Sequence, residues 1–219
     1  MTTIAEQVDK MTETMGPQLP SEVLSAFAQE QAELAANGMP EGVIQVGAPL
    51  PDADLLDPNG ASMTLYEALG DGVAVLVFYR GAWCPYCNVA LKSYQGELVP
   101  ELTHRGVRLI AVSPQKPDGS LSMQEKNELT FTVLSDPGNQ IAKAVGIVSA
   151  PSAEGRAAQL QLGLDLTEVN ADGTIEIPMP TTIIVDADRK VRWIDVHPDY
   201  STRSEPDQIL AALDDVAAR

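Results

Sequence analysis

The sequence is poor in cysteine, in basic residues and in long apolar runs, and each scarcity excludes a kind of protein. Lysine and arginine total 14 against 31 acidic residues, a formal net charge of −17. This balance argues against a nucleic-acid partner, because affinity for nucleic acid comes from lysines and arginines that neutralise phosphates. It argues equally against binding to anionic membranes. The longest apolar runs are strand-sized, so no segment is expected to span a bilayer.

Metal and nucleotide cofactors are not expected either. A structural zinc site needs four ligands, and the chain offers two cysteines plus His104 and His197, which we interpret as surface or helix-end histidines. No phosphate-binding glycine motif is present. The N-terminus has no basic start followed by an apolar segment, so we expect no secretory signal and a cytoplasmic location.

Both cysteines fall in one tetrad, Cys84-Pro85-Tyr86-Cys87. It follows the apolar run at 73–78 and precedes a helix-like stretch, which places the pair at a strand-to-helix junction. Two cysteines at this spacing can close a reversible disulfide, and the positive end of a helix favours thiolate over thiol. In a reducing compartment such a lone pair is expected to be catalytic rather than structural. The tetrad therefore predicts a redox enzyme.

The chain is predicted to form one domain with a helical extension, divided into residues 1–42 and 43–219. Ile4, Val8, Met11 and Met15 share one helix face, and Gly16-Pro17 ends that helix. Ser21 is predicted to cap a second helix, which stops at 37–38. This hairpin either covers the main domain or forms a dimer contact, and both interpretations stay open.

After residue 42 strand and helix patterns alternate. A turn is predicted at 57–60, and residues 148–177 read as a less regular connection. The expected strands are 73–79, 107–112, 131–134, 182–185 and 191–196, and the expected helices are 89–102 with a break at Pro100, 121–129, 140–145 and 206–218. This order predicts an α/β fold with a mixed central sheet flanked by helices.

Several segments resemble a known family. Residues 78–87, ending in Trp83-Cys84-Pro85-Tyr86-Cys87, are similar to the active-site junction of the thioredoxin superfamily. Leu134-Ser135-Asp136-Pro137, the helix pattern at 141–146, the lead-in at 47–50 and the hairpin at 181–193 resemble the peroxiredoxin branch, the AhpC/TSA type. The resemblance covers about 43–218 and implies a thioredoxin-like fold of the peroxiredoxin type.

The peroxiredoxin motif Pro-x-x-x-Thr-x-x-Cys places the peroxide-attacking cysteine at Cys87. Cys84 then occupies the threonine position and Arg80 the proline position. The family also supplies an arginine just before the penultimate strand, where this chain has none. The resemblance therefore implies that Arg80 stands in for it, because a nearby cation favours the thiolate. Tyr200 and Arg203, after the last strand, are interpreted as anchors of their loop.

Met179-Pro180-Thr181 opens a strand in the way that the cis-proline loop does in thioredoxin-like proteins. The resemblance implies that the backbone of Met179 faces the cysteine pair and holds a partner chain by strand-like hydrogen bonds. Trp83 is expected to shield the pair or contact the substrate. The residues predicted to support the site or bind substrate are thus Arg80, Trp83, Pro85, Met179, Pro180 and Thr181.

Two mechanisms fit these residues. As a peroxidase, Cys87 attacks a hydroperoxide, Cys84 resolves the sulfenic acid as a disulfide, and a thioredoxin-like dithiol restores the pair. As a thiol-disulfide oxidoreductase, Cys84 attacks a disulfide substrate and Cys87 resolves the mixed disulfide. The peroxidase interpretation is favoured because most of the chain resembles that branch. A non-catalytic binding module and a homodimer are further alternatives.

Overall fold

The apolar run that precedes the tetrad forms the central strand of the molecule, β3 (Ala74–Phe78). Every residue of β3 is buried, as a continuous apolar run predicts for a strand covered on both faces. It pairs in parallel with β4 (Arg108–Ser113) and antiparallel with β8 (Thr181–Val185). The computed structural model describes residues 2–218.

Seven strands form the main sheet, in the order β2-β1-β5-β4-β3-β8-β9. The remaining strands of this sheet are β1 (Asp54–Leu56), β2 (Ser62–Thr64), β5 (Thr132–Ser135) and β9 (Val191–Val196). Both β3 and β9 run antiparallel to β8, so they point in the same direction. The segments that follow these two strands therefore leave the sheet at the same edge, where the cysteine pair lies.

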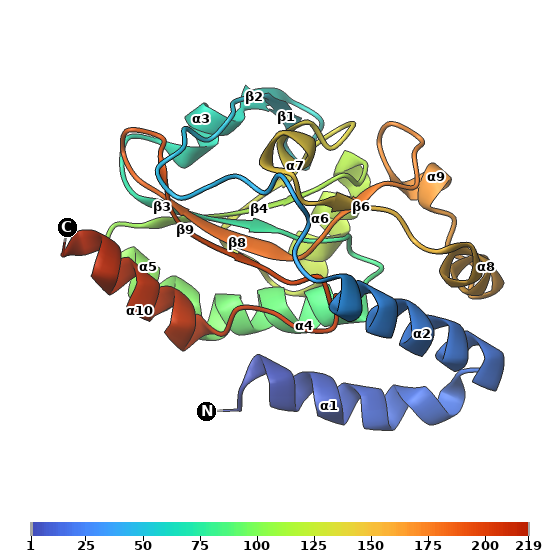
Figure 1. Cartoon of the computed structure of the whole chain (residues 1–219). Coiled ribbons are helices and arrows are strands. Elements are labelled where there is room, and N and C mark those ends of the chain that lie inside the picture. Colours follow the sequence, from blue (N-terminus) through green and yellow to red (C-terminus); the bar gives the residue numbers. More distant parts are fainter. Residues whose placement is uncertain (1, 219) are drawn as a thin grey trace.

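Helices cover both faces of the sheet (Figure 1). One face carries α4 (Pro85–Ser93), α5 (Val99–His104) and α10 (Pro206–Ala217), whose apolar residues share a core with both cysteines. The other face carries α3 (Leu65–Leu69) and α7 (Gln140–Val145), which pack in a second core. This arrangement confirms the predicted α/β fold with a mixed sheet.

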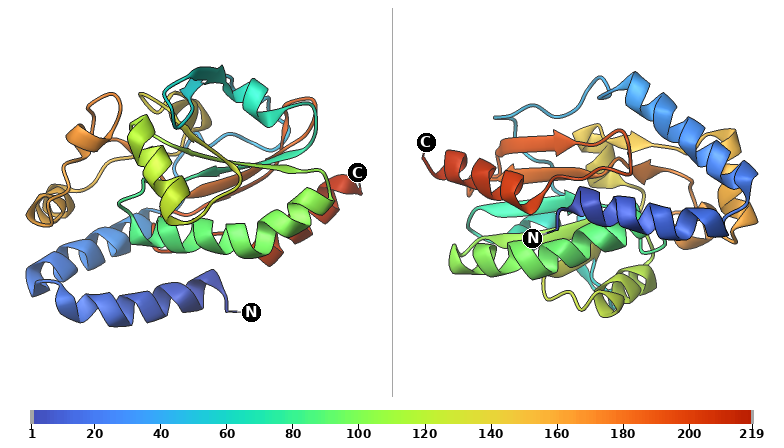
Figure 2. Two further views of the ribbon diagram at one scale, coloured as in Figure 1. Left: turned by 180° about the vertical axis from the view of Figure 1, so that it is seen from behind. Right: turned by 90° about the horizontal axis from the view of Figure 1, so that it is seen from below.

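The N-terminal residues form the predicted hairpin of α1 (Ile4–Met15), a 3₁₀ turn (Gly16–Gln18) and α2 (Ser21–Asn37). Figure 2 shows α1 lying along α4, and α2 reaching α8 (Ala153–Gln161). Glu205 accepts hydrogen bonds from the first amides of α1, at 2.8 and 2.9 Å. The hairpin thus covers the main domain, as one interpretation predicts. Its second possible role as a dimer contact stays a prediction, as does the domain division after residue 42.

Some local expectations are wrong. Ser21 is the first residue of α2 and not its cap, a position that Pro20 holds. The helix expected at 121–129 is α6 (Pro117–Lys126), because Pro117 suits the first turn of a helix. The connection at 148–177 contains α8 and the short elements β6 (Val148–Ser149), α9 (Leu166–Val169) and β7 (Ile177–Pro178).

The helix that carries the cysteines does not break at Pro100. It continues from α4 through a π-helical segment (Tyr94–Leu98) into α5, and Pro100 is tolerated in the first turn of α5. The wider turn contains the buried Tyr94, whose hydroxyl donates to the backbone oxygen of Ser204 at 2.7 Å. The long helix is thereby tied to the loop before α10. Within residues 2–218, no helix is both long enough and apolar enough to cross a bilayer.

Replacing Gly146 by alanine is expected to destabilise the fold. Gly146 ends α7 with φ of +81°, and a Cβ there would lie 2.4 Å from the backbone oxygen of Gly42. The left-handed backbone costs alanine roughly 1–2 kcal/mol, and the clash adds roughly 1–3 kcal/mol. Gly163 has the same φ with open space around it, so Gly163→Ala is the matched control. Denaturant unfolding measures both, and equal losses of unfolding free energy would contradict the clash.

Candidate active site

The two cysteines begin helix α4. Cys84 is the N-cap, Pro85 is the first helical residue and Cys87 is the third, one turn from Cys84. Both cysteines are fully buried, and no disulfide joins them. Proline suits this first turn because its position needs no amide donor. The local sequence therefore places both sulfurs at the positive end of a helix, where a thiolate is stabilised.

Arg203 contacts the second cysteine directly. Its Nη2 donates to Sγ of Cys87 at 3.1 Å, although the two residues lie 116 positions apart in the sequence. The other terminal nitrogen, Nη1, donates to the backbone oxygens of Tyr200 at 2.7 Å and Thr202 at 2.5 Å. The interpretation of Arg203 as a loop anchor is thus incomplete, because the same guanidinium also holds the sulfur.

The loop that carries Arg203 is fixed on both sides. Asp195, in β9, accepts hydrogen bonds from Ser204 Oγ at 2.8 Å and contacts His197 Nε2 at 3.0 Å. The other ring nitrogen of His197 lies 2.7 Å from Oγ1 of Thr202. These bonds, with the Tyr94 hydroxyl described above, fix the backbone around Arg203. Its guanidinium is therefore positioned before any substrate arrives.

Arg80 is the second cation of the site. It is buried, and its guanidinium carbon lies 3.8 Å from the ring centroid of Tyr200 and 5.1 Å from that of Trp83. Cations favour such positions over aromatic rings. The rings of Tyr86 and Tyr200 are in turn 6.2 Å apart. Tyr200 is thus more than a loop anchor, since it holds Arg80 beside the pair.

The surroundings shift the pKa values of the two thiols in opposite directions. Burial alone raises the pKa of Cys87, but the hydrogen bond from Cys84, the charge of Arg203, and the backbone amide and charge of Arg80 together hold that pKa well below its usual range. For Cys84, burial, the hydrogen bond to Cys87 and the charge of Cys87 raise the pKa. These surroundings favour the thiolate at Cys87 and the protonated thiol at Cys84.

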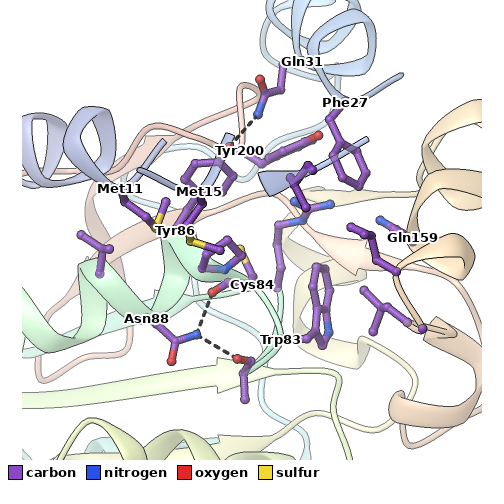
Figure 3. Close-up of a pocket in the computed structure, with 18 of the residues that line it drawn as sticks. Met11, Met15, Phe27, Gln31, Trp83, Cys84, Tyr86, Asn88, Gln159 and Tyr200 are labelled. Atoms are coloured by element: carbon purple, nitrogen blue, oxygen red, sulfur yellow. Dashed lines mark hydrogen bonds between the residues drawn. The ribbon is translucent and has the colours of Figure 1, made fainter. Parts of the chain in front are cut away.

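A cavity of about 700 Å³ ends at the pair (Figure 3). Cys84 lines it, whereas Cys87 does not. Trp83 and Pro85 also line it, with Arg80 and Tyr200. The N-terminal hairpin, the end of α8 with the segment after it, and residues of α4 and α6 contribute the other walls, which are mainly apolar.

The backbone around the pair is held by side-chain amides. Asn88 Nδ2 donates to the backbone oxygens of Ala82 and Cys84, each at 2.8 Å, and Gln115 accepts from the amide of Ala82. Asn127 donates to Asn88 Oδ1 at 2.9 Å. The sequence contains no signal that the side chains of Asn88, Gln115 and Asn127 support the cysteine pair. They hold it indirectly, through hydrogen bonds to the backbone around it and to each other.

The structure places Met179, Pro180 and Thr181 outside the cavity lining. The expected cis-proline loop is wrong, since residues 2–218 contain no cis peptide bond. The amide of Met179 donates to the backbone oxygen of Ile147 at 2.7 Å, and its carbonyl accepts from Oγ1 of Thr181 at 2.9 Å. This backbone is engaged within the chain because β6 and β7 pair beside it, so its amide is not free to hold a partner.

The part of the chain that the structure describes contains no group of three or more histidine, cysteine, aspartate or glutamate side chains placed to hold a metal ion. The site instead consists of a dithiol, two buried arginines and the rings that hold one of them. A dithiol at the start of the helix that follows the central strand of this sheet is the arrangement typical of the thioredoxin-like fold.

Residues 46–194 match the AhpC/TSA family. The match spans more than half of the 219 residues, so the chain belongs to that family, as the sequence motifs predicted.

Relatives of two kinds are similar to this chain. Peroxiredoxin Bcp of Escherichia coli is 28% identical over 167 residues, which cover 76% of this chain and 94% of Bcp. The thiol-disulfide oxidoreductase ResA of Bacillus thuringiensis is 27% identical over 113 residues, 51% of this chain. That match spans 64% of ResA, less than two thirds of its length. Reduced Prx3 of Vibrio vulnificus, solved in complex with hydrogen peroxide, shares the fold with a TM-score of 0.63 at 22% identity, over 78% of this chain and 99% of Prx3.

Proposed function

We propose that this protein is a thiol-dependent peroxidase in which Cys87 attacks the hydroperoxide. One observation carries the proposal: Arg203 donates a hydrogen bond to Cys87 Sγ at 3.1 Å and supplies the positive charge that a reactive thiolate needs. The arginine missing from its usual place in the sequence is thus replaced from the loop after β9. Membership of the AhpC/TSA family supports the same chemistry.

The first step is a two-electron oxidation of sulfur. The Cys87 thiolate attacks the terminal oxygen of the hydroperoxide, the O–O bond breaks, and Cys87 becomes a sulfenic acid. The leaving oxygen departs as an alkoxide, or as hydroxide from hydrogen peroxide, and takes a proton from solvent. Arg80 and Arg203 stabilise the negative charge as it moves from sulfur to oxygen.

The second step closes the disulfide. The Cys84 thiol, one helical turn away, attacks the sulfenic sulfur of Cys87, and the hydroxyl leaves as water. Two thiols are then oxidised for each hydroperoxide reduced. A dithiol reductant of the thioredoxin kind would return the pair to the reduced state by disulfide exchange.

A second function is thiol-disulfide exchange led by Cys84. Access favours it, because Cys84 lines the cavity and Cys87 does not, and the similarity to ResA points the same way. The charges favour Cys87, since the pKa of Cys84 is raised and that of Cys87 is lowered. We rank peroxidase first because the thiolate is the reacting species.

The test is single-turnover oxidation. The reduced protein is mixed with hydrogen peroxide or an organic hydroperoxide in a stopped-flow instrument, and the fluorescence of Trp83, which adjoins the pair, is followed. We expect oxidation at least a hundredfold faster than that of a free thiol such as N-acetylcysteine, with loss of two thiols per hydroperoxide consumed. Oxidation no faster than the free thiol with every hydroperoxide would reject the peroxidase and favour exchange led by Cys84.

A further inference from the structure

The cavity over the cysteine pair is far larger than hydrogen peroxide requires. It measures about 700 Å³, a volume typical of sites for small organic ligands. A water molecule occupies roughly 30 Å³ of liquid, so hydrogen peroxide, with two oxygens, needs roughly a tenth of this space. The volume therefore fits a substrate that carries a substantial organic body.

The walls of the cavity are apolar, and the N-terminal hairpin supplies many of them. Met11 and Met15 come from α1 and Phe27 from α2, and Leu162 and Leu164, which follow α8, line the same cavity. Figure 3 shows Met11, Met15 and Phe27 around the opening above Cys84 and Trp83. The residues matched to the family begin at 46, so the hairpin is an addition to the family domain.

The charges of the lining also set it apart from the rest of the molecule. The chain holds 31 acidic residues, yet among the described residues 2–218 no carboxylate lines the cavity, and the charged residues that line it are Arg80 and Lys126. Flexible methionine side chains adapt to irregular apolar shapes. Such a lining solvates an apolar body and does not repel the negative charge that develops at the cleaved O–O bond.

We propose, building on the peroxidase function above, that the N-terminal hairpin makes the enzyme selective for organic hydroperoxides with a bulky apolar body. The body lies between the hairpin and the segment after α8, and the O–O group points to the cysteine pair at the end of the cavity. Hydrogen peroxide lacks that body and gains nothing from these walls. The hairpin is thus a specificity element for the site.

The test compares two hydroperoxides on the full-length, reduced protein without any reductant. Cumene hydroperoxide carries an apolar body, and hydrogen peroxide does not. We expect the second-order rate constant of oxidation to be at least tenfold higher with cumene hydroperoxide. Equal rate constants, both well above that of a free thiol, would overturn the selectivity and leave the peroxidase function intact. Two rate constants no higher than that of a free thiol would reject the peroxidase function itself.

Matched variants locate the selectivity in the cavity. Met15 (43% exposed) and Leu162 (46%) line it, whereas Met39 (62%) and Leu160 (47%) do not. We expect Met15→Glu and Leu162→Glu to lower the ratio of the two rate constants by roughly tenfold, because a charge is introduced into the apolar walls. Met39→Glu and Leu160→Glu are expected to keep the ratio of the unmodified protein. All four positions are partly exposed, so the variants are expected to fold.

Other occupants of the cavity give different results with the same variants. If the two lining variants keep the ratio but slow reduction of the disulfide by thioredoxin, the cavity holds the reductant protein. If they keep the ratio but change the sedimentation coefficient, the cavity wall contacts a second copy of the chain. Either result overturns the proposed selectivity.

Discussion

Replacing Arg203 by methionine is expected to slow the oxidation of Cys87 by hydroperoxide at pH 7 by roughly ten- to a hundredfold, since a hydrogen bond to a charged group contributes roughly 1.5–3 kcal/mol. Methionine fills most of the same space but has no charge and no donor. Without the donor at 3.1 Å, the pKa of Cys87 rises and less thiolate is present.

The pH dependence of the oxidation rate tests whether Arg203 lowers the pKa of Cys87. Because the pKa of Cys87 is lowered in the folded protein, we expect the oxidation rate of the unmodified protein to change little at and above neutral pH and to fall in acid as the thiolate is protonated. In Arg203→Met the rate should still rise between pH 7 and 9. Iodoacetamide alkylation at a series of pH values measures the same titration without peroxide.

Arg105→Met is the control for net charge. Arg105 is a partly exposed residue paired with Asp214 at 2.6 Å and lies outside the site. Its loss removes the same charge from the molecule, and the expected change in rate is within twofold. An equal effect of the two variants would show that Arg203 acts only through the overall field.

The serine variants of the two cysteines are expected to differ completely. Cys87→Ser removes the thiolate, so peroxide oxidation falls by at least a hundredfold. Cys84→Ser keeps the thiolate and keeps a hydroxyl that donates to it, so Cys87 is still oxidised once, at a rate within about tenfold of the unmodified protein. The product is a sulfenic acid, which dimedone traps and mass spectrometry detects, because no thiol remains to form the disulfide.

The same pair of variants separates the alternative function. If Cys84 leads disulfide exchange, Cys84→Ser loses all activity on a disulfide substrate, and Cys87→Ser accumulates a stable mixed disulfide at Cys84. Cys84→Ala adds a finer comparison, because alanine cannot donate to Cys87. Its oxidation should be slower than that of Cys84→Ser, in proportion to the lost hydrogen bond.

The sequence was sufficient to predict the centre of the fold and the reactive pair. A continuous apolar run predicts a strand buried on both faces, and β3 is such a strand. Cys84 and Cys87 follow it after the short segment 79–83, so their place at a helix start is predicted by local spacing alone. The helix α8 was missed because its segment is rich in alanine and polar residues and has a weak apolar stripe. It is placed by tertiary contacts with α2, among them the hydrogen bond from Ser152 N to Glu30 at 2.7 Å.

The sequence gives less guidance on the roles of the two arginines of the site. Arg80 lies four residues before Cys84, so proximity alone suggested its role. Arg203 has no such local signal, and only the sheet order explains its position. Because β3 and β9 run in the same direction, the loops that follow them meet. A sequence pattern does not reveal the direction of pairing across β8, so nothing in the sequence indicates that Arg203, which we propose replaces the missing arginine, lies beside Cys87.

The position of Cys84 one helical turn from Cys87 has a consequence for how the proposed peroxidase resists overoxidation. A sulfenic acid has two fates: a second hydroperoxide converts it irreversibly to sulfinic acid, or a thiol captures it as a disulfide. Capture by a neighbour in the same helix has a high effective molarity, and its rate does not depend on how much oxidant is present. In the proposed peroxidase, rapid capture by Cys84 keeps the sulfinic acid rare until the hydroperoxide concentration is high. A peroxidase of this kind is suited to clearing large amounts of oxidant rather than to reporting its level.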